Sequence, residues 1–190
     1  MTIVSDTKMT SAATDRNSQP LDVLKWVNEA AAWMTPDRVV WCDGSPGEAK
    51  RLKEEMVESG TLIALNSKKR PRSFLARSEP SDVARVEART FVCSTDPVDA
   101  GPTNNWIDPE SMKATLQEAS KGSMKGRTLY VVPFSMGLLQ SPLARCGVQI
   151  TDSPYVVLSL HLMVRVSTTV LDAIAAGRSW TKCTHTVGAP

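Results

Sequence analysis

The residues that can do chemistry in this chain are few and scattered. The four cysteines form no Cys-x-x-Cys pair and stand far apart, at Cys42, Cys93, Cys146 and Cys183. The two histidines are His161 and His185. Structural zinc normally needs paired, closely spaced ligands, and Cys183 with His185 supplies only two, so no metal site is predicted. The cysteines are instead expected to be reduced thiols of an intracellular protein.

One segment approaches the pattern of a phosphate-binding loop, from Gly122 to Thr128. Such a loop needs G-x-x-x-x-G-K-[ST] between a strand and a helix, so that backbone N–H groups face the phosphates and the lysine reaches the outer ones. The segment here is one residue short, has arginine in place of the lysine, and follows an expected helix instead of an expected strand. We therefore interpret Gly122 as a helix cap and Gly126 as a turn, and predict no nucleotide-binding residues.

Composition indicates one ordinary globular domain. The chain has 190 residues, of which 42% are hydrophobic and 22% charged, and its net charge is +2. A net charge this small argues neither for nor against a nucleic-acid partner, and none is predicted. The basic run 68–72 is interpreted as a solvated loop. The longest apolar stretch, 155–166, is too short and too polar to span a membrane. A soluble, cytoplasmic protein without a membrane partner is expected.

The elements that must position any site begin after a polar segment. Residues 1–19 have little to bury and are expected to be a disordered tail. A helix is predicted from Pro20 to about Met34, then a strand over 39–42. Ser45, Pro46 and Glu48 form the pattern of a capping box at the start of a helix that ends at Gly60.

The remaining chain continues to alternate strands with helices, which predicts an α/β fold with a mixed sheet flanked by helices. The segment after Pro154 has apolar residues at strand spacing, but Ser153 and Pro154 form a helix start, and we predict a helix there. Two long loops are predicted, over 94–106 and 135–146. The other expected elements are strands over 61–65, 90–93, 128–134 and 147–151 and helices over 78–85, 109–122 and 170–176.

Seven stretches, taken in order and spacing, resemble the N-terminal region of the GTP-dependent phosphoenolpyruvate carboxykinases. The likeness covers about Val39 to Pro190. The segment Ala100–Trp106 is similar to bacterial members of the family. The stretches are Cys42–Ser45, Asp82–Glu87, Asp99–Trp106, Met124–Thr128, Val132–Gly137, Ile150–Val157 and Lys182–Gly188.

The resemblance implies an activity and a small set of site residues. Enzymes of this family convert oxaloacetate and GTP to phosphoenolpyruvate, GDP and carbon dioxide in gluconeogenesis, with Mn²⁺ or Mg²⁺ as the metal ion. By motif match, Arg85 holds the substrate carboxylate and Glu87 helps to favour a closed lid. From the residues alone, Arg85 would be read as a surface arginine and Glu87 as a solvated glutamate. The turn predicted at Phe134–Gly137 either faces substrate with its backbone or is purely structural.

The family pattern continues beyond Pro190 into nucleotide- and metal-binding motifs that this sequence does not contain. After the polar tail at 1–19, the resemblance therefore implies a substrate-binding α/β domain at 20–190, truncated before the kinase-like domain that would be its partner. Neither GTP nor a metal ion is expected to bind this chain alone. The alternatives are a non-catalytic carboxylate-binding module and an inactive fragment, which would expose an apolar patch where the missing half should pack.

Two local departures from the family pattern affect loops. Leu138-Leu139-Gln140 stands where Pro-Leu-Gly is usual, and Val166-Ser167 stands where Met-Gly is usual. Loss of a proline and a glycine loosens a loop. Replacement of the second glycine by Ser167 is costly only if the backbone there has a positive φ.

Overall fold

The structure is a computed structural model that describes residues 19–77 and 87–188. Arg85 and the helix predicted over 78–85 lie outside the described residues, as does nearly all of the predicted tail. Within the described ranges no helix is both long and apolar enough to cross a membrane.

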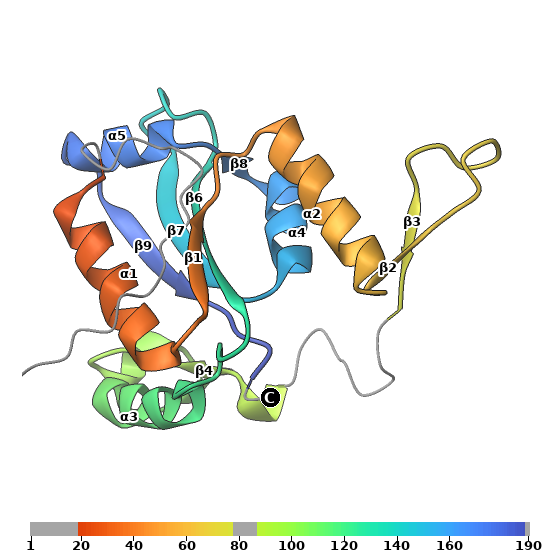
Figure 1. Cartoon of the computed structure of the whole chain (residues 1–190). Helices are drawn as coiled ribbons and strands as arrows, with labels where there is room; N and C mark the ends of the chain where they lie inside the picture. Colours follow the sequence, from red (N-terminus) through yellow and green to blue (C-terminus); the bar gives the residue numbers. More distant parts are fainter. Residues whose placement is uncertain (1–18, 78–86, 189–190) are drawn as a thin grey trace, which may run out of the picture.

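A mixed sheet forms the centre of the molecule, in the strand order β1-β6-β7-β9 (Figure 1). β1 (Arg38–Trp41) pairs in parallel with β6 (Thr128–Met136), which is antiparallel to β7 (Arg145–Thr151). β9 (Trp180–Thr184) lies parallel to β7, and β8 (Arg165–Val166) is antiparallel to the end of β6. The prediction of an α/β fold with a mixed sheet is confirmed.

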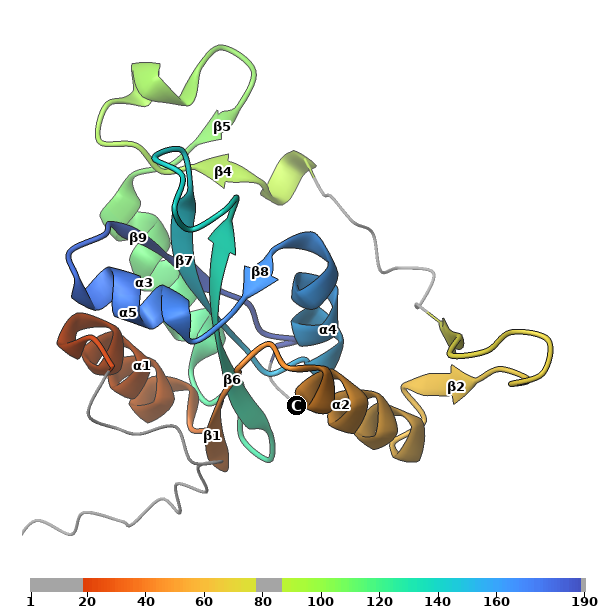
Figure 2. The same ribbon diagram turned by 90° about the horizontal axis from the view of Figure 1, so that it is seen from above.

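Helices cover both faces of this sheet, two on each side (Figures 1 and 2). α1 (Leu21–Met34) and α5 (Thr169–Ala175) pack on one face, and α2 (Pro46–Glu58) and α4 (Pro154–Met163) pack on the other. α3 (Pro109–Ser120) lies beyond one end of the sheet. The sequence prediction that a helix follows Pro154 is confirmed, with the Ser153 hydroxyl accepting from the Val156 N–H at 3.4 Å.

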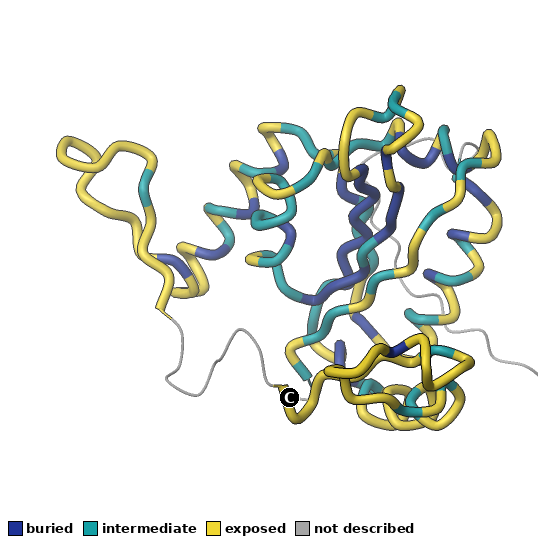
Figure 3. Tube along the Cα trace, turned by 180° about the vertical axis from the view of Figure 1, so that it is seen from behind, coloured by how far each residue is buried: buried dark blue, intermediate teal, exposed yellow. Residues whose placement is uncertain are grey.

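The alternation of side chains along β6 produces two separate cores. Leu129 and Val131 point into the core beneath α1 and α5, whereas Tyr130 and Val132 point into the core beneath α2 and α4. Successive side chains of a strand face opposite sides of a sheet, so one central strand supplies both cores. Figure 3 shows the buried residues concentrated along the central strands, while the periphery is exposed.

Two small two-stranded sheets lie outside the central one. β2 (Leu62–Ala64) and β3 (Phe74–Ala76) form an antiparallel hairpin that projects past α2, and the basic run at 68–72 is exposed at its turn. β4 (Phe91–Val92) and β5 (Asn105–Trp106) pair in parallel. Two short 3-10 helices, η2 (Glu87–Arg89) and η3 (Pro97–Ala100), flank β4.

The structure corrects several predicted boundaries. β6 extends to Met136 and β7 begins at Arg145, so the loop predicted over 135–146 shrinks to the connection of a hairpin. Phe134–Met136 is therefore strand, and the turn begins only at Gly137. The loop predicted over 94–106 contains η3 and β5. The short strands β3, β8 and β9 have no clear apolar pattern, and the sequence does not predict them.

The departure at Val166-Ser167 is compatible with the backbone. Among the described residues other than glycine, only Thr35 and Arg72 have a positive φ. Neither Gln140 nor Ser167 therefore needs the freedom of a glycine. Ser167 instead begins a turn, in which its hydroxyl accepts from the Thr169 N–H at 3.2 Å.

Gly44 is the glycine that the packing requires most strictly. Its φ is +75°, and a Cβ built on it would lie 2.0 Å from the Val166 carbonyl oxygen in β8. Gly60, at the end of α2, has a similar φ of +79° but nothing within 4 Å of such a Cβ. An alanine would therefore meet similar backbone strain at both positions, and the two positions differ only in what surrounds its Cβ.

We predict that Gly44→Ala lowers the free energy of unfolding by at least about 2 kcal/mol more than Gly60→Ala. Both variants lose about 1 kcal/mol or somewhat more through the positive φ, and only Gly44→Ala must also displace the backbone of β8. Urea unfolding of the two variants measures the difference. Equal losses would show that the approach of Gly44 to β8 does not constrain the fold.

Candidate functional site

The first candidate region is the segment that follows Arg85 in the chain. Glu87 begins η2 and is exposed. The Asn105 side-chain amide in β5 donates to the Glu87 carbonyl at 2.8 Å and to the Thr90 carbonyl at 3.1 Å. One side chain thus fixes both ends of η2 to β5, immediately after the position of Arg85 in the sequence.

Side chains of the stretch 99–106 form hydrogen bonds to backbone carbonyls of the same stretch and of the loop before it. The Asn104 amide donates to the Ala100 carbonyl at 2.7 Å, and the Trp106 indole N–H donates to the Ser94 carbonyl at 2.9 Å. Gly101 allows the turn with a φ of +76°. A pocket of about 520 Å³ lies between the stretch 99–106 and η2. It is lined mainly by polar residues: Glu87, Ala88, Thr90, Thr103, Asn104 and Asn105.

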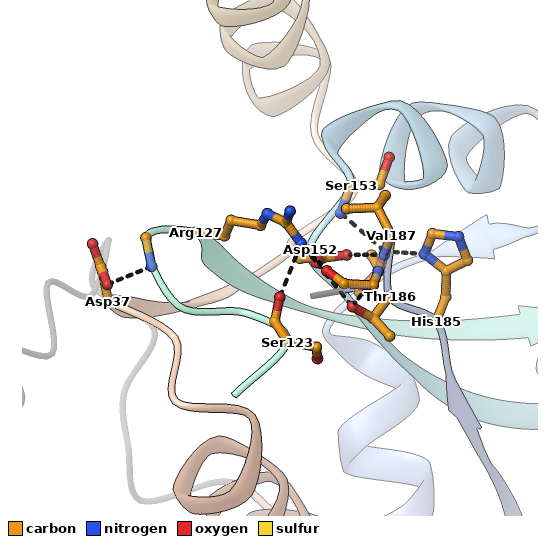
Figure 4. Close-up of polar contacts among 11 residues, drawn as sticks. Asp37, Ser123, Arg127, Asp152, Ser153, His185, Thr186 and Val187 are labelled. Atoms are coloured by element: carbon orange, nitrogen blue, oxygen red, sulfur yellow. Dashed lines mark hydrogen bonds and ion pairs between the residues drawn. The ribbon is translucent and has the colours of Figure 1, made fainter. Parts of the chain in front are cut away.

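The second candidate region is a network around the buried carboxylate of Asp152 (Figure 4). Its Oδ2 accepts from Arg127 Nη1 at 2.9 Å and from the Thr186 hydroxyl at 3.0 Å, and its Oδ1 accepts from the Val187 N–H at 3.0 Å. The side chain of Asp152 is fully buried and that of Arg127 is 27% exposed. A buried carboxylate with three donors is well satisfied.

Arg127 extends this network to the last described residues. Its Nη1 also contacts the Ser123 carbonyl at 2.9 Å and the Gly188 carbonyl at 2.6 Å. Next to it, the Thr151 hydroxyl lies 2.9 Å from His185 Nδ1. The network therefore joins the turn before β6, the end of β7 and the segment after β9. Because Arg127 Nη1 is bound to protein acceptors and the Asp152 carboxylate is fully buried, we interpret this network as structural.

The third candidate region surrounds Glu48, which is 3% exposed. The capping interaction differs from the predicted one, because the Glu48 carboxylate accepts from the N–H groups of Asp43 and Gly44, at 3.2 and 3.0 Å, and not from Ser45. Ser45 does accept from the Glu48 N–H, at 3.0 Å. His161 Nε2 in α4 lies 3.1 Å from Glu48 Oε2, so this carboxylate links α2 to α4.

Three of the four cysteines, Cys42, Cys146 and Cys183, are partly or fully buried. Burial, and next the nearby Glu48 carboxylate, raises the pKa of the Cys42 thiol far above its usual value, so this group stays protonated and unreactive. Burial also raises the pKa of Cys146 and of Cys183. Across residues 19–77 and 87–188, no group of three or more histidine, cysteine or acidic side chains is arranged to hold a metal ion.

Comparison with known proteins identifies the origin of these features. The model of the phosphoenolpyruvate carboxykinase N-terminal domain matches residues 25–190. The chain belongs to this family. It is 55% identical to the phosphoenolpyruvate carboxykinase [GTP] of Corynebacterium efficiens and 54% identical to that of Corynebacterium glutamicum strain R, over 89% of its length in each case. It is 48% identical to the corresponding Chlamydia muridarum protein over 87% of its length.

The chain spans 28% of the length of each of these three relatives. Asp152, Arg127 and Asn105 all lie in stretches that carry the family resemblance, but sequence reasoning gave them no roles. Their partners are mostly backbone atoms distant in sequence, which no residue pattern identifies. The role of Arg85 in holding the substrate carboxylate stays a prediction, because Arg85 lies outside the described residues.

We predict that Asp152→Asn lowers the free energy of unfolding by about 2–4 kcal/mol, because the charge partner of Arg127 is lost and an amide N–H₂ group faces its donors. Asp37→Asn is the matched control. Asp37 accepts one exposed bond, from the Gly126 N–H at 3.0 Å, and its replacement should cost less than about 1 kcal/mol. Thermal and urea unfolding measure both. Similar small losses in the two variants would contradict a central role for Asp152.

Proposed function

We propose that this chain supplies the part of a GTP-dependent phosphoenolpyruvate carboxykinase that binds the carboxylate of the substrate. In the whole enzyme, oxaloacetate and GTP are converted to phosphoenolpyruvate, GDP and carbon dioxide. Membership of the family supports this proposal. The observation that carries it is the Asn105 amide, which fixes η2 directly after the segment that contains Arg85.

Arg85 is the residue to which we assign the carboxylate. A guanidinium group is planar and always charged, and it donates two parallel hydrogen bonds to the two oxygens of a carboxylate. Two residues after Arg85 in the sequence, the Glu87 carbonyl accepts a hydrogen bond from the Asn105 side-chain amide. The polar pocket beside η2 offers space for a small dicarboxylate such as oxaloacetate.

Glu87 is assigned a contact with a mobile lid carried by the rest of a complete carboxykinase. Its side chain is exposed at the start of η2, where a second polypeptide segment can reach it. The described residues offer no group of three or more histidine, cysteine or acidic side chains that could hold a metal ion, and the nucleotide- and metal-binding motifs of the family are not found in this sequence. We therefore assign the metal ion and GTP to the kinase-like part of the enzyme, and we assign only substrate binding to this chain. We also propose that residues 20–190 act as the substrate-binding domain of a cytoplasmic enzyme.

We predict that the 190-residue chain binds phosphoenolpyruvate and that Arg85→Ala abolishes this binding. Arg85→Lys should weaken binding by about tenfold or more, because an ammonium group cannot make the bidentate contact. Arg89→Ala is the matched control, since Arg89 lies in the same short segment, in η2, and is exposed. Isothermal titration calorimetry measures all three variants against the unmodified chain.

Equal affinity of the Arg85→Ala and Arg89→Ala variants would overturn the assignment of Arg85. A separate assay of the unmodified chain with oxaloacetate, GTP and Mn²⁺ is expected to form no phosphoenolpyruvate. Clear turnover would mean that the chain holds a nucleotide site of its own, and the division of labour proposed above would be wrong.

A further inference from the structure

The outward face of α4 carries no charge. The helix, Pro154–Met163, contains no aspartate, glutamate, lysine or arginine along its whole length. Its inward face is well explained: Val157 is fully buried, Leu160 packs against the core beneath α2 and α4, and His161 contacts Glu48. The opposite face has no such partner among the described residues.

This outward face is apolar and accessible. Tyr155, Ser159 and Leu162 follow one another at the spacing of one helical stripe, and Met163 lies beside them. The exposed fractions are 49% for Tyr155, 89% for Leu162 and 70% for Met163. The Ser159 hydroxyl donates to the Tyr155 carbonyl at 3.0 Å, so its hydrogen-bonding capacity is used within the helix. We refer to these four residues as the α4 face.

The other three long helices provide an internal comparison. Each carries charged residues that are exposed and paired along its outer surface: Lys25 with Glu29 in α1, Lys50 with Glu54 and Arg51 with Glu55 in α2, and Lys113 with Glu110 in α3. A helix that faces water normally has such a surface, and an uncharged one indicates contact with another apolar surface. α4 alone among these four has the composition of a helix covered on both sides.

The position at which the chain leaves the domain indicates what covers this face. Val187 is fixed to Asp152, two residues before the start of α4, and Gly188 is fixed to Arg127 in the same network (Figure 4). The three relatives are more than three times as long as the matched segment, since it spans only 28% of each. A polypeptide that continues from Gly188 therefore starts beside the first turn of α4.

We propose that the α4 face is the docking surface for the polypeptide that follows the matched segment in carboxykinases, and that the docked surface is apolar and poor in charge. The proposal rests on the proposed function for the identity of this partner. It does not depend on Arg85 or on the pocket beside η2.

The test compares the 190-residue chain with a fusion of the same chain to the remainder of the Corynebacterium efficiens enzyme. Leu162→Cys is placed in both, and the rate of maleimide labelling is followed at that site by peptide mass spectrometry. We expect labelling to be at least about tenfold slower in the fusion, because a docked surface must open before it reacts. Glu54→Cys, on the charged face of α2, is the control and should change less than about twofold.

A second variant tests the same surface by a different measurement, so that the result does not depend on the new cysteine alone. Leu162→Glu should leave the Tm of the 190-residue chain nearly unchanged, since Leu162 is 89% exposed there. In the fusion the same change should lower the Tm by several degrees, because it buries a charge against an apolar surface. Unchanged Tm in both proteins, or equal labelling of Leu162→Cys in both, would overturn the proposal.

Two further outcomes separate this inference from its alternatives. Sedimentation of the unmodified 190-residue chain should give a monomer. A dimer that Leu162→Glu dissociates would assign the α4 face to a second copy and overturn the proposal. Arg85→Ala in the fusion should leave the protection of Leu162→Cys intact. If Leu162→Cys is protected in the fusion but the unmodified fusion binds no substrate, the docking surface is supported and the proposed function is not. If the unmodified fusion binds substrate but Leu162→Cys is labelled freely, the proposed function is supported and the docking surface is not.

Discussion

The buried carboxylate of Asp152 is the interaction on which the rest of this domain depends. It accepts hydrogen bonds from Arg127 and from the adjacent residues Thr186 and Val187, so it joins its own segment to two others that are distant in the chain. A charge buried in this way is costly unless it is paired and hydrogen-bonded, so the three segments are held together by one requirement. The consequence is that the turn before β6, the start of α4 and the segment after β9 occupy defined positions relative to the sheet (Figure 4).

The fold was largely predictable because its elements carry local signals. The hydroxyl of Ser45 and that of Ser153 each accept from the backbone three residues later, as expected for residues that begin helices. The apolar run of β6 likewise predicts a buried strand. The short strands β8 and β9 have no such signal, since they are defined by pairing with β6 and β7. The loop predicted over 135–146 was too long for the same reason: Arg145 and Cys146 join β7 by pairing with β6.

The candidate site was less predictable than the fold. Sequence resemblance points to Arg85 and Glu87, but it does not explain how they are positioned. The structure adds Asn105, whose amide fixes η2 through two backbone carbonyls. Backbone acceptors leave no residue pattern, so no reading of side-chain types could have found this contact. The same holds for Glu48, which satisfies the backbone of Asp43 and Gly44 in place of the cap expected from its spacing.

The central proposal for this domain is that a small carboxylate binds beside η2, next to the segment that contains Arg85. Titration of the 190-residue chain with oxalate, followed by backbone amide chemical shifts in NMR spectra, tests it most directly. The account predicts shifts at residues 85–90 and 103–106, with little change near the engaged arginine, Arg127, or along α4. Shifts centred on Arg127, or none at 85–90 at saturating oxalate, would contradict it.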